Sequence, residues 1–194
     1  MKHFITLLIA FSTLSVQAQN DKYLGHVTTI DTTIKTLYDV ISGAKGEERD
    51  WELMKYLFHP DAKLIPTGMT KDTIYRAKYM TVEDYITNSS KFLVENGFFE
   101  FEINREVQQF GHIAHVFSTY ECFKTLDDKK AFMRGMNSIQ LIYDNNRWWI
   151  INIYWAQESP FNRIPREYLP GSSPNIPAEP VKPAAPPKIK KATY

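Results

Sequence analysis

Two stretches decide the fold: FFEFEINREVQQFGHIAHVFSTYECF at residues 98–123 and RGMNSIQLIYDNNRWWIINIYW at residues 134–155. Apolar and polar residues alternate in both, and this period of two is typical of strands with one buried face. Turn signals at Gly111-His112, Asp127 to Lys130 and Asn145-Asn146 divide the region into four long strands. Because short turns join them, we expect consecutive strands to pair antiparallel.

The residues before this region have helical rather than strand periodicity. Apolar residues repeat at helical spacing over 28–42, 47–58 and 81–97, with a short strand at 62–66 and room for another at 74–77. Thr28 with Asp31, and Thr81 with Asp84, have the spacing of capping boxes. The sequence therefore predicts an α+β fold, with three helices packed on a curved antiparallel sheet of four long strands plus one or two short ones.

Short turns also fix which residues face each other across the sheet. The resulting register predicts an apolar inner face against the helices, and it turns Glu100, Glu102 and Glu106 outward. The apolar residues of that inner face are Phe99, Phe101, Ile103, Val107, Val116, Cys122, Ile139, Leu141, Trp148 and Ile150.

Several polar residues interrupt this inner face. An apolar cavity with a few convergent polar groups is the usual form of a small-molecule site. The alternative is an ordinary core in which these groups satisfy one another. With two helix residues added, the candidate ligand-binding residues are Tyr38, Tyr85, Arg105, Ser118, Tyr120, Asn137, Asn152 and Tyr154.

Arg105 is the one charged residue among these candidates. A guanidinium keeps its charge in a protein, so a buried one requires an anionic partner. The predicted inner face supplies no carboxylate. The open alternatives are a carboxylate from a helix or loop, a position at the edge of the sheet, or a ligand anion bound with Tyr120 and Asn137.

The predicted outer face is apolar over its later strands. An apolar patch of this size requires a cover. A homodimer through the outer sheet face is the simplest cover, and the second helix or the C-terminal tail are alternatives. The patch consists of Phe117, Ile142, Trp149, Ile151, Ile153 and Trp155.

The two ends of the chain have distinctive compositions. Residues 1–18 have the pattern of a secretory signal peptide with cleavage after Ala18, so we expect an exported protein, periplasmic or secreted, with no integral membrane segment after cleavage. Residues 159–194 are expected to be irregular, because seven of the eleven prolines lie at or beyond Pro170. The lysines of this proline-rich tail do not form the basic folded face that nucleic-acid binding needs.

The chemistry-bearing residue types exclude some functions. Cys122 is the only cysteine, so an intramolecular disulfide and a CxxC motif are excluded, and its strand position favours burial as a small hydrophobe. No two histidines have the helical spacing of metal ligands. We therefore expect neither a metal nor a cofactor.

The element order and three motifs resemble the nuclear transport factor 2-like (NTF2-like, SnoaL-like) superfamily. The motifs are LMKYLFHPDAKLIP at 53–66, GHIAHVFSTYE at 111–121 and the 134–155 stretch quoted above, so the domain spans about 22–158. The resemblance implies a cone-shaped fold with a pocket. Members include isomerases, dehydratases and cyclases, and pocketed proteins with no known reaction.

The resemblance also indicates where catalytic groups would lie. Tyr38 matches the tyrosine of the ketosteroid isomerases, which are a worked example of an oxyanion hole, but the strand at 62–66 has no acid at the position of their base. The favoured function is therefore binding of a small hydrophobic or anionic molecule without a conventional catalytic base. The alternative is an isomerase or lyase acting on a small hydrophobic or organic-acid substrate.

Overall fold

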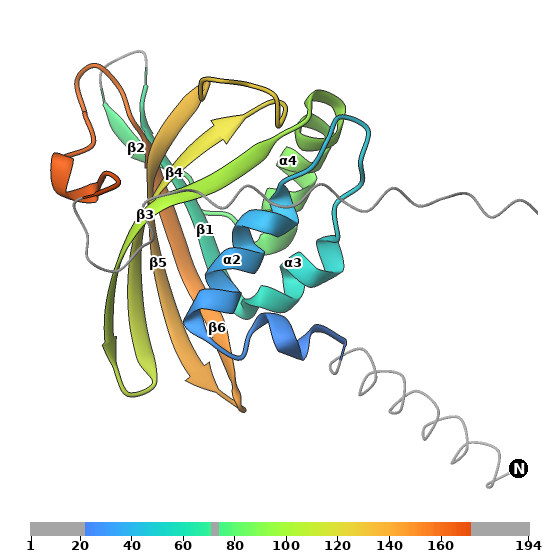
Figure 1. Ribbon diagram of the computed structural model, residues 1–194. Helices are drawn as coiled ribbons and strands as arrows, with labels where there is room; N and C mark the ends of the chain where they lie inside the picture. The colour runs from blue at the N-terminus through green and yellow to red at the C-terminus, as the bar shows by residue number, and fades with distance from the viewer. Residues whose placement is uncertain (1–21, 71–73, 172–194) are drawn as a thin grey trace, which may run out of the picture.

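The computed structural model describes residues 22–70 and 74–171. Three α-helices cover one side of a strongly curved sheet, and the last part of the described chain lies on the other side (Figure 1). The helices are α2 (Ile30–Ile41), α3 (Trp51–Leu57) and α4 (Val82–Asn96), preceded by a short 3-10 helix, η1 (Leu24–His26). The three predicted helices are confirmed, with shorter ends.

Side chains at the helix starts explain where the helices begin. Thr81 caps α4 in the predicted capping box with Asp84. In α2 the box is formed by Thr29 and Thr32, so the prediction of Thr28 with Asp31 is wrong by one residue. The end of α4 is Gly97, whose φ of 71° is easily adopted only by glycine.

The sheet has six strands in the order β2-β1-β6-β5-β4-β3. The four long strands are β3 (Phe99–Phe110), β4 (Ile113–Phe123), β5 (Met133–Asp144) and β6 (Arg147–Gln157). They form the predicted antiparallel meander.

The two early strands are β1 (Phe58–Met69) and β2 (Tyr75–Ala77). β1 is longer than expected and pairs parallel to β6, so the prediction of a wholly antiparallel sheet is wrong. The connection from β1 to β6 contains helix and sheet, which gives the chain the length that parallel pairing requires.

β3 contains an irregularity that reverses its faces. The turn at Gly111-His112 predicts that Arg105 pairs with Ser118, and it does, but the register shifts between Glu102 and Asn104. A bulge of this kind inserts one residue, so side chains before it exchange faces with the expected pattern. Glu102 therefore pairs with Tyr120 on the inner face, and Glu100 follows it inward. The outward placement of these two glutamates was wrong.

β6 has a second irregularity with the same effect. The register shifts between Gln140 and Leu141 of β5, and beyond this point Asn137 pairs with Trp155. Ile153 and Trp155 consequently line the inner side, whereas Asn152 and Tyr154 turn outward. The inner placement of Asn152 and Tyr154, and the outer placement of Ile153 and Trp155, were wrong.

The C-terminal segment 158–169 covers part of the outer face. It contains the 3-10 helix η2 (Arg166–Tyr168) and buries Ile164 to 9% exposure. The Thr119 hydroxyl donates to the Tyr168 carbonyl at 2.6 Å, and the Tyr168 ring meets Phe117 edge-on at 5.1 Å. The chain thus packs on the sheet beyond residue 158, where the sequence predicts an irregular tail. Residues 1–18 and 172–194 lie outside the described residues.

This cover weakens the argument for a dimer. Two of the residues that motivated it, Ile153 and Trp155, face the helices, and Phe117 is in contact with the C-terminal segment. The oligomeric state stays a prediction without their support. Within 22–70 and 74–171, no helix has the length and hydropathy to cross a bilayer.

Candidate functional site

A cavity of about 290 Å³ lies between the helices and the inner face of the sheet. Most of its wall is apolar, with aromatic side chains from α2, β1, α4, β4 and β6 and from Phe98 just before β3. Asn88 and Phe92 of α4 line the cavity and are also exposed, so the cavity opens beside this helix. Its lining consists of Leu37, Tyr38, Ile41, Met54, Phe58, Leu64, Tyr85, Asn88, Ser89, Phe92, Leu93, Phe98, Glu100, Tyr120, Met133, Asn137, Ile153 and Trp155.

Glu100 supplies a carboxyl group to this wall. Its Oε1 accepts a hydrogen bond from Asn137 Nδ2 at 3.3 Å, and its Oε2 accepts one from Cys122 Sγ at 3.5 Å. Burial raises the pKa of Glu100 to about 7, because the charged form loses solvation, and these two hydrogen bonds oppose the rise. The group therefore changes charge near neutral pH.

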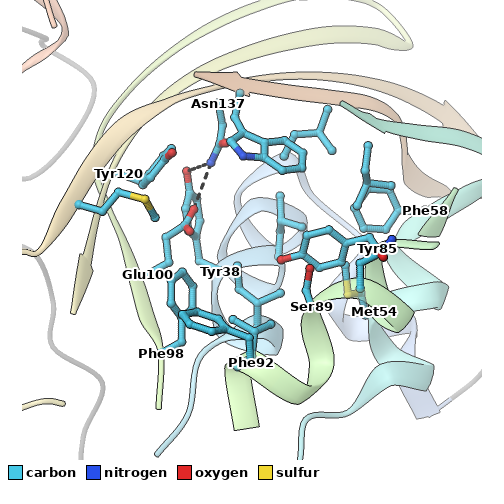
Figure 2. A pocket seen from close by; sticks show the side chains of 18 residues that line it. Tyr38, Met54, Phe58, Tyr85, Ser89, Phe92, Phe98, Glu100, Tyr120 and Asn137 are labelled. Atoms are coloured by element: carbon cyan, nitrogen blue, oxygen red, sulfur yellow. Dashed lines mark hydrogen bonds between the residues drawn. The ribbon is translucent and has the colours of Figure 1, made fainter. Parts of the chain in front are cut away.

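A chain of hydrogen bonds leads from Glu100 into the wall (Figure 2). Asn137 Nδ2 also donates to the Tyr38 hydroxyl at 3.0 Å, and Tyr38 lies 2.7 Å from the Ser118 hydroxyl. Since Ser118 donates its proton to Glu102, Tyr38 must be the donor to Ser118. The Tyr38 proton is thus directed away from the cavity, and burial raises the pKa of Tyr38 well above its usual value.

Arg105 lies beyond the far end of this chain. Its guanidinium hydrogen bonds to the Glu102 carboxylate through Nε at 2.9 Å and to Asp31 through Nη1 at 2.6 Å. Arg105 is not among the residues that line the cavity. Its anionic partners are therefore Glu102, which the bulge turns inward, and Asp31 of α2. A helix carboxylate was one of the structural alternatives left open by the sequence.

Tyr120 presents a hydroxyl to the cavity close to Glu100 and Asn137 (Figure 2). No group in the described part of the chain hydrogen bonds to this hydroxyl, and burial raises the pKa of Tyr120. A Cβ on Gly135 would lie 2.4 Å from the Tyr120 hydroxyl and 2.5 Å from the Ala156 carbonyl oxygen. The absence of a side chain at Gly135 therefore leaves the space that Tyr120 occupies.

Tyr85 and Ser89 of α4 form a second polar position, apart from Glu100 (Figure 2). Burial raises the pKa of Tyr85, and a hydrogen bond with Ser89 partly offsets this effect. The Tyr85 ring also meets Trp155 edge-on, with centroids 6.2 Å apart. These contacts fix the orientation of the tyrosine in the wall.

The predicted site residues thus fall into three groups. Tyr38, Tyr85, Tyr120 and Asn137 line the cavity, and Ser118 supports Tyr38 from behind. Arg105 is held in an ion-pair cluster outside the cavity. Asn152 and Tyr154 lie on the opposite face, where Tyr154 lines a pocket of about 430 Å³ between the sheet and the C-terminal segment.

Sequence reasoning missed Glu100, Ser89 and Trp155. Glu100 and Trp155 were assigned to the wrong face, because the bulges interrupt the alternation. Ser89 follows Tyr85 by four residues, so helical spacing could have identified it as a neighbour. As for metals, no group of three or more His, Cys, Asp or Glu side chains among residues 22–70 and 74–171 is placed to hold an ion.

Solved structures of other proteins share this architecture. A protein of unknown function with a cystatin-like fold from Nostoc punctiforme aligns with a TM-score of 0.52 and 13% identity, over 68% of this chain and 90% of its own. An NTF2-like protein from Cytophaga hutchinsonii aligns with a TM-score of 0.50 and 14% identity, over 66% of this chain and 95% of its own. The present protein has the NTF2-like fold.

A third NTF2-like structure agrees with this assignment. An NTF2-like protein with a cystatin-like fold from Novosphingobium aromaticivorans gives a TM-score of 0.50 and 13% identity, over 78% of this chain and 93% of its own. No protein-family model and no curated protein matches the sequence. The NTF2-like fold predicted from the sequence motifs is confirmed, and at such identities the likeness concerns the fold alone.

Proposed function

We propose that this protein binds a small, largely apolar molecule in the cavity between the helices and the sheet. The observation that carries the proposal is the bulge in β3, which turns Glu100 into a cavity otherwise lined mainly by aromatic and aliphatic groups. Concave, mostly apolar sites with a few oriented polar groups are characteristic of small-molecule binding. A core built only for stability would gain nothing from a carboxyl group that loses solvation.

The cavity volume limits the size of the ligand. An apolar cavity of about 150 Å³ accommodates benzene, and this one is about 290 Å³. A ligand with about two fused rings is the appropriate size. It would pass between Asn88 and Phe92, where the lining is exposed.

The proposal is tested by ligand screening with a blocked cavity as control. We expect two-ring fragments to shift amide resonances of α4, β3 and β5 in two-dimensional NMR spectra of the protein. Ser89→Trp, which places a large side chain in the cavity wall, should abolish these shifts while leaving the spectrum folded. Fragments that bind Ser89→Trp as well as they bind the wild type would contradict the proposal.

A second candidate function is an isomerase or lyase that moves a proton, and the pKa of about 7 at Glu100 favours it. A general base works best when its pKa lies near the operating pH. The Glu100 carboxylate would remove a proton from the carbon next to a carbonyl. The C–H electron pair would form an enolate, whose oxygen would accept a hydrogen bond from Tyr120, and Glu100 would return the proton.

This candidate makes a measurement possible without knowledge of the natural substrate. In deuterated buffer, the wild type should speed deuterium incorporation into 2-tetralone, a two-ring ketone, and Glu100→Gln should reduce the rate to that of buffer. Glu106→Gln is the control, because Glu106 pairs with Phe117 on the outer face of the same strand. Equal rates for wild type and Glu100→Gln would leave only the binding function.

We also propose that the chain is exported after cleavage behind Ala18, as periplasmic or secreted protein. Support comes from the sequence of residues 1–18 alone, because they lie outside the described residues. Intact mass of material recovered outside the cytosol should correspond to a chain beginning at Gln19. Recovery only of a chain beginning at Met1 would contradict export.

A further inference from the structure

The charges around the cavity restrict the class of ligand. Its 18 lining residues include one carboxyl group, Glu100, and none of them is lysine, arginine or histidine. An anionic ligand would therefore find no cation in this described wall and would be repelled by Glu100 when that group is ionised. The lining thus disfavours the anionic ligands that the sequence left open.

Arg105, on the inner face of β3, does not change this balance. Arg105 has two carboxylate partners, Glu102 and Asp31, and its side chain is 13% exposed. Glu100, Glu102, Asp31 and Arg105 together comprise three carboxyl groups and one guanidinium. These four side chains therefore contribute no net positive charge beside the cavity.

The aromatic walls favour a cation as well. Positive groups bind over the faces of Trp, Tyr and Phe rings, and the attraction grows when water is excluded. Seven of the 18 side chains that line the cavity are aromatic. They are Tyr38, Phe58, Tyr85, Phe92, Phe98, Tyr120 and Trp155.

The hydrogen bonds of Glu100 leave it capable of binding a further donor. Its two oxygens accept from an amide at 3.3 Å and from a thiol at 3.5 Å, and neither donor is charged. A charged donor makes shorter and stronger hydrogen bonds to a carboxylate. The free Tyr120 hydroxyl lies on the same side of the cavity and offers an additional acceptor (Figure 2).

We infer that the ligand of this cavity is a protonated amine with a body of about two rings, whose ammonium group pairs with the Glu100 carboxylate. The inference rests on the proposed binding function and names the chemistry of its ligand. The amine contributes three donors and a positive charge, and the rings occupy the aromatic wall. The competing ligand is a neutral carbonyl or alcohol that accepts a hydrogen bond from protonated Glu100.

Three probes with the same two-ring body separate these possibilities. They are 2-aminotetralin, 2-tetralol and tetralin-2-carboxylate, which are cationic, neutral and anionic at pH 7.5. Titration calorimetry on the wild type should give an affinity for the amine at least 10-fold above that for the alcohol, with no binding of the acid. The difference should come from the charged pair, since the bodies are matched.

Variants of β3 identify the group responsible. Glu100→Gln should lower the affinity for the amine to that for the alcohol. The affinity for the alcohol should stay within 3-fold of its wild-type value. Glu106→Gln should change neither affinity, because its side chain is on the outer face. Thermal unfolding of each variant establishes that it is folded before the affinities are compared.

The outcomes distinguish the inference from the function on which it rests. Alcohol binding as tight as amine binding, or an amine preference that survives in Glu100→Gln, would overturn the amine assignment and leave cavity binding intact. Binding of all three probes to Ser89→Trp would place them elsewhere on the molecule. If none of the three binds the wild type, both the amine assignment and the proposed function fail for ligands of this size.

Discussion

Alternation of polar and apolar residues predicts the inward-facing side chains correctly on the regular strand pair β4–β5. It fails on parts of the two bulged strands, β3 and β6. Between β4 and β5, a four-residue loop at Asp127 to Lys130 predicts that Ser118 pairs with Ile139. Ser118 instead pairs with Asn137, two residues away, yet both side chains face inward as predicted. A shift of two residues preserves the faces of a strand, whereas a shift of one exchanges them. One inserted residue in β3 therefore has more consequence for the site than a misjudged loop between β4 and β5.

The polar groups of the cavity come from both kinds of strand. Tyr120 and Asn137 lie on the regular pair. Glu100 precedes the bulge in β3 and Trp155 follows the bulge in β6, and without these bulges both side chains would face away from the cavity. Bulges occur often beside binding sites, where they redirect a side chain. The regular pair thus contributes the hydroxyl and amide groups of the site, and the bulged strands contribute its carboxyl group and its tryptophan.

The strongest test of this comparison is a charge placed either at Ile151, the inserted residue of the bulge in β6, or at Ile153, two residues beyond it. Ile153 is 6% exposed and lies within the core, whereas Ile151 is 39% exposed. Ile153→Asp should lower the free energy of unfolding by more than about 3 kcal/mol, because it buries an unpaired charge. Ile151→Asp should cost less than about 1 kcal/mol.

Urea denaturation of the two variants measures the difference. The sequence pattern without a bulge puts both isoleucines on the outer face, so it predicts two small and similar effects. Equal midpoints for the two variants would therefore argue against the bulge.

A test on the regular pair concerns Gly135, which faces Tyr120 across β4 and β5. Gly135→Ala should lower the free energy of unfolding by about 1 to 3 kcal/mol, because its Cβ would overlap the Tyr120 hydroxyl and the Ala156 carbonyl oxygen. Gly68→Ala in β1 is the matched control, since a Cβ there meets no atom within 4 Å. Thermal unfolding that ranks Gly68→Ala as the more damaging change would contradict the packing described.

Much of the fold could be predicted from the sequence, because its signals are local. Turn residues such as Asn145 and Asn146, with φ of 50° and 62°, define a hairpin directly. The capping residue Thr81 defines the start of a helix in the same way. Tyr120 and Asn137 of the site followed from alternation on the unbroken strands β4 and β5.

The remaining parts of the site depend on events with no local signal. The stretch from Glu100 to Asn104 alternates between polar and apolar residues, and no glycine marks the inserted residue. With the bulge in place, Glu102 hydrogen bonds to Arg105 of the same strand and to Ser118 of β4, and Glu100 hydrogen bonds to Asn137 of β5. The parallel pairing of β1 with β6 similarly depends on residues about 90 positions apart.

The bulge of β3 should also be visible in the pH dependence of stability. The folded-state pKa of Glu100 is raised to about 7, above the 4.5 of a free side chain. The folded protein therefore holds this proton more tightly than the unfolded chain does, and its stability falls as pH rises from about 4.5 through 7. The titratable groups that face it are the hydroxyls of Tyr38, Tyr85 and Tyr120 and the thiol of Cys122.

Those neighbouring groups have pKa values raised above their usual range, so they do not titrate between pH 5 and 8. Between pH 5 and 8 the free energy of unfolding of the wild type should fall by about 1 to 2 kcal/mol more than that of Glu100→Gln. Urea denaturation at each pH measures this difference. Glu106→Gln should follow the wild type. Parallel curves for wild type and Glu100→Gln would mean that Glu100 is solvated and faces outward.

The smallest expected effect separates two adjacent residues of β6, Tyr154 and Trp155, which face opposite sides of the sheet beyond the bulge. Trp155→Phe removes part of the cavity wall and of the edge contact with Tyr85, so a two-ring probe such as 2-tetralol should lose 3- to 10-fold in affinity, about 1 kcal/mol. Tyr154→Phe should leave that affinity unchanged, because Tyr154 lies under the C-terminal segment. Titration calorimetry on both variants decides the matter: an uninterrupted strand would reverse the two results, since it would turn Tyr154 toward the helices and Trp155 away from them.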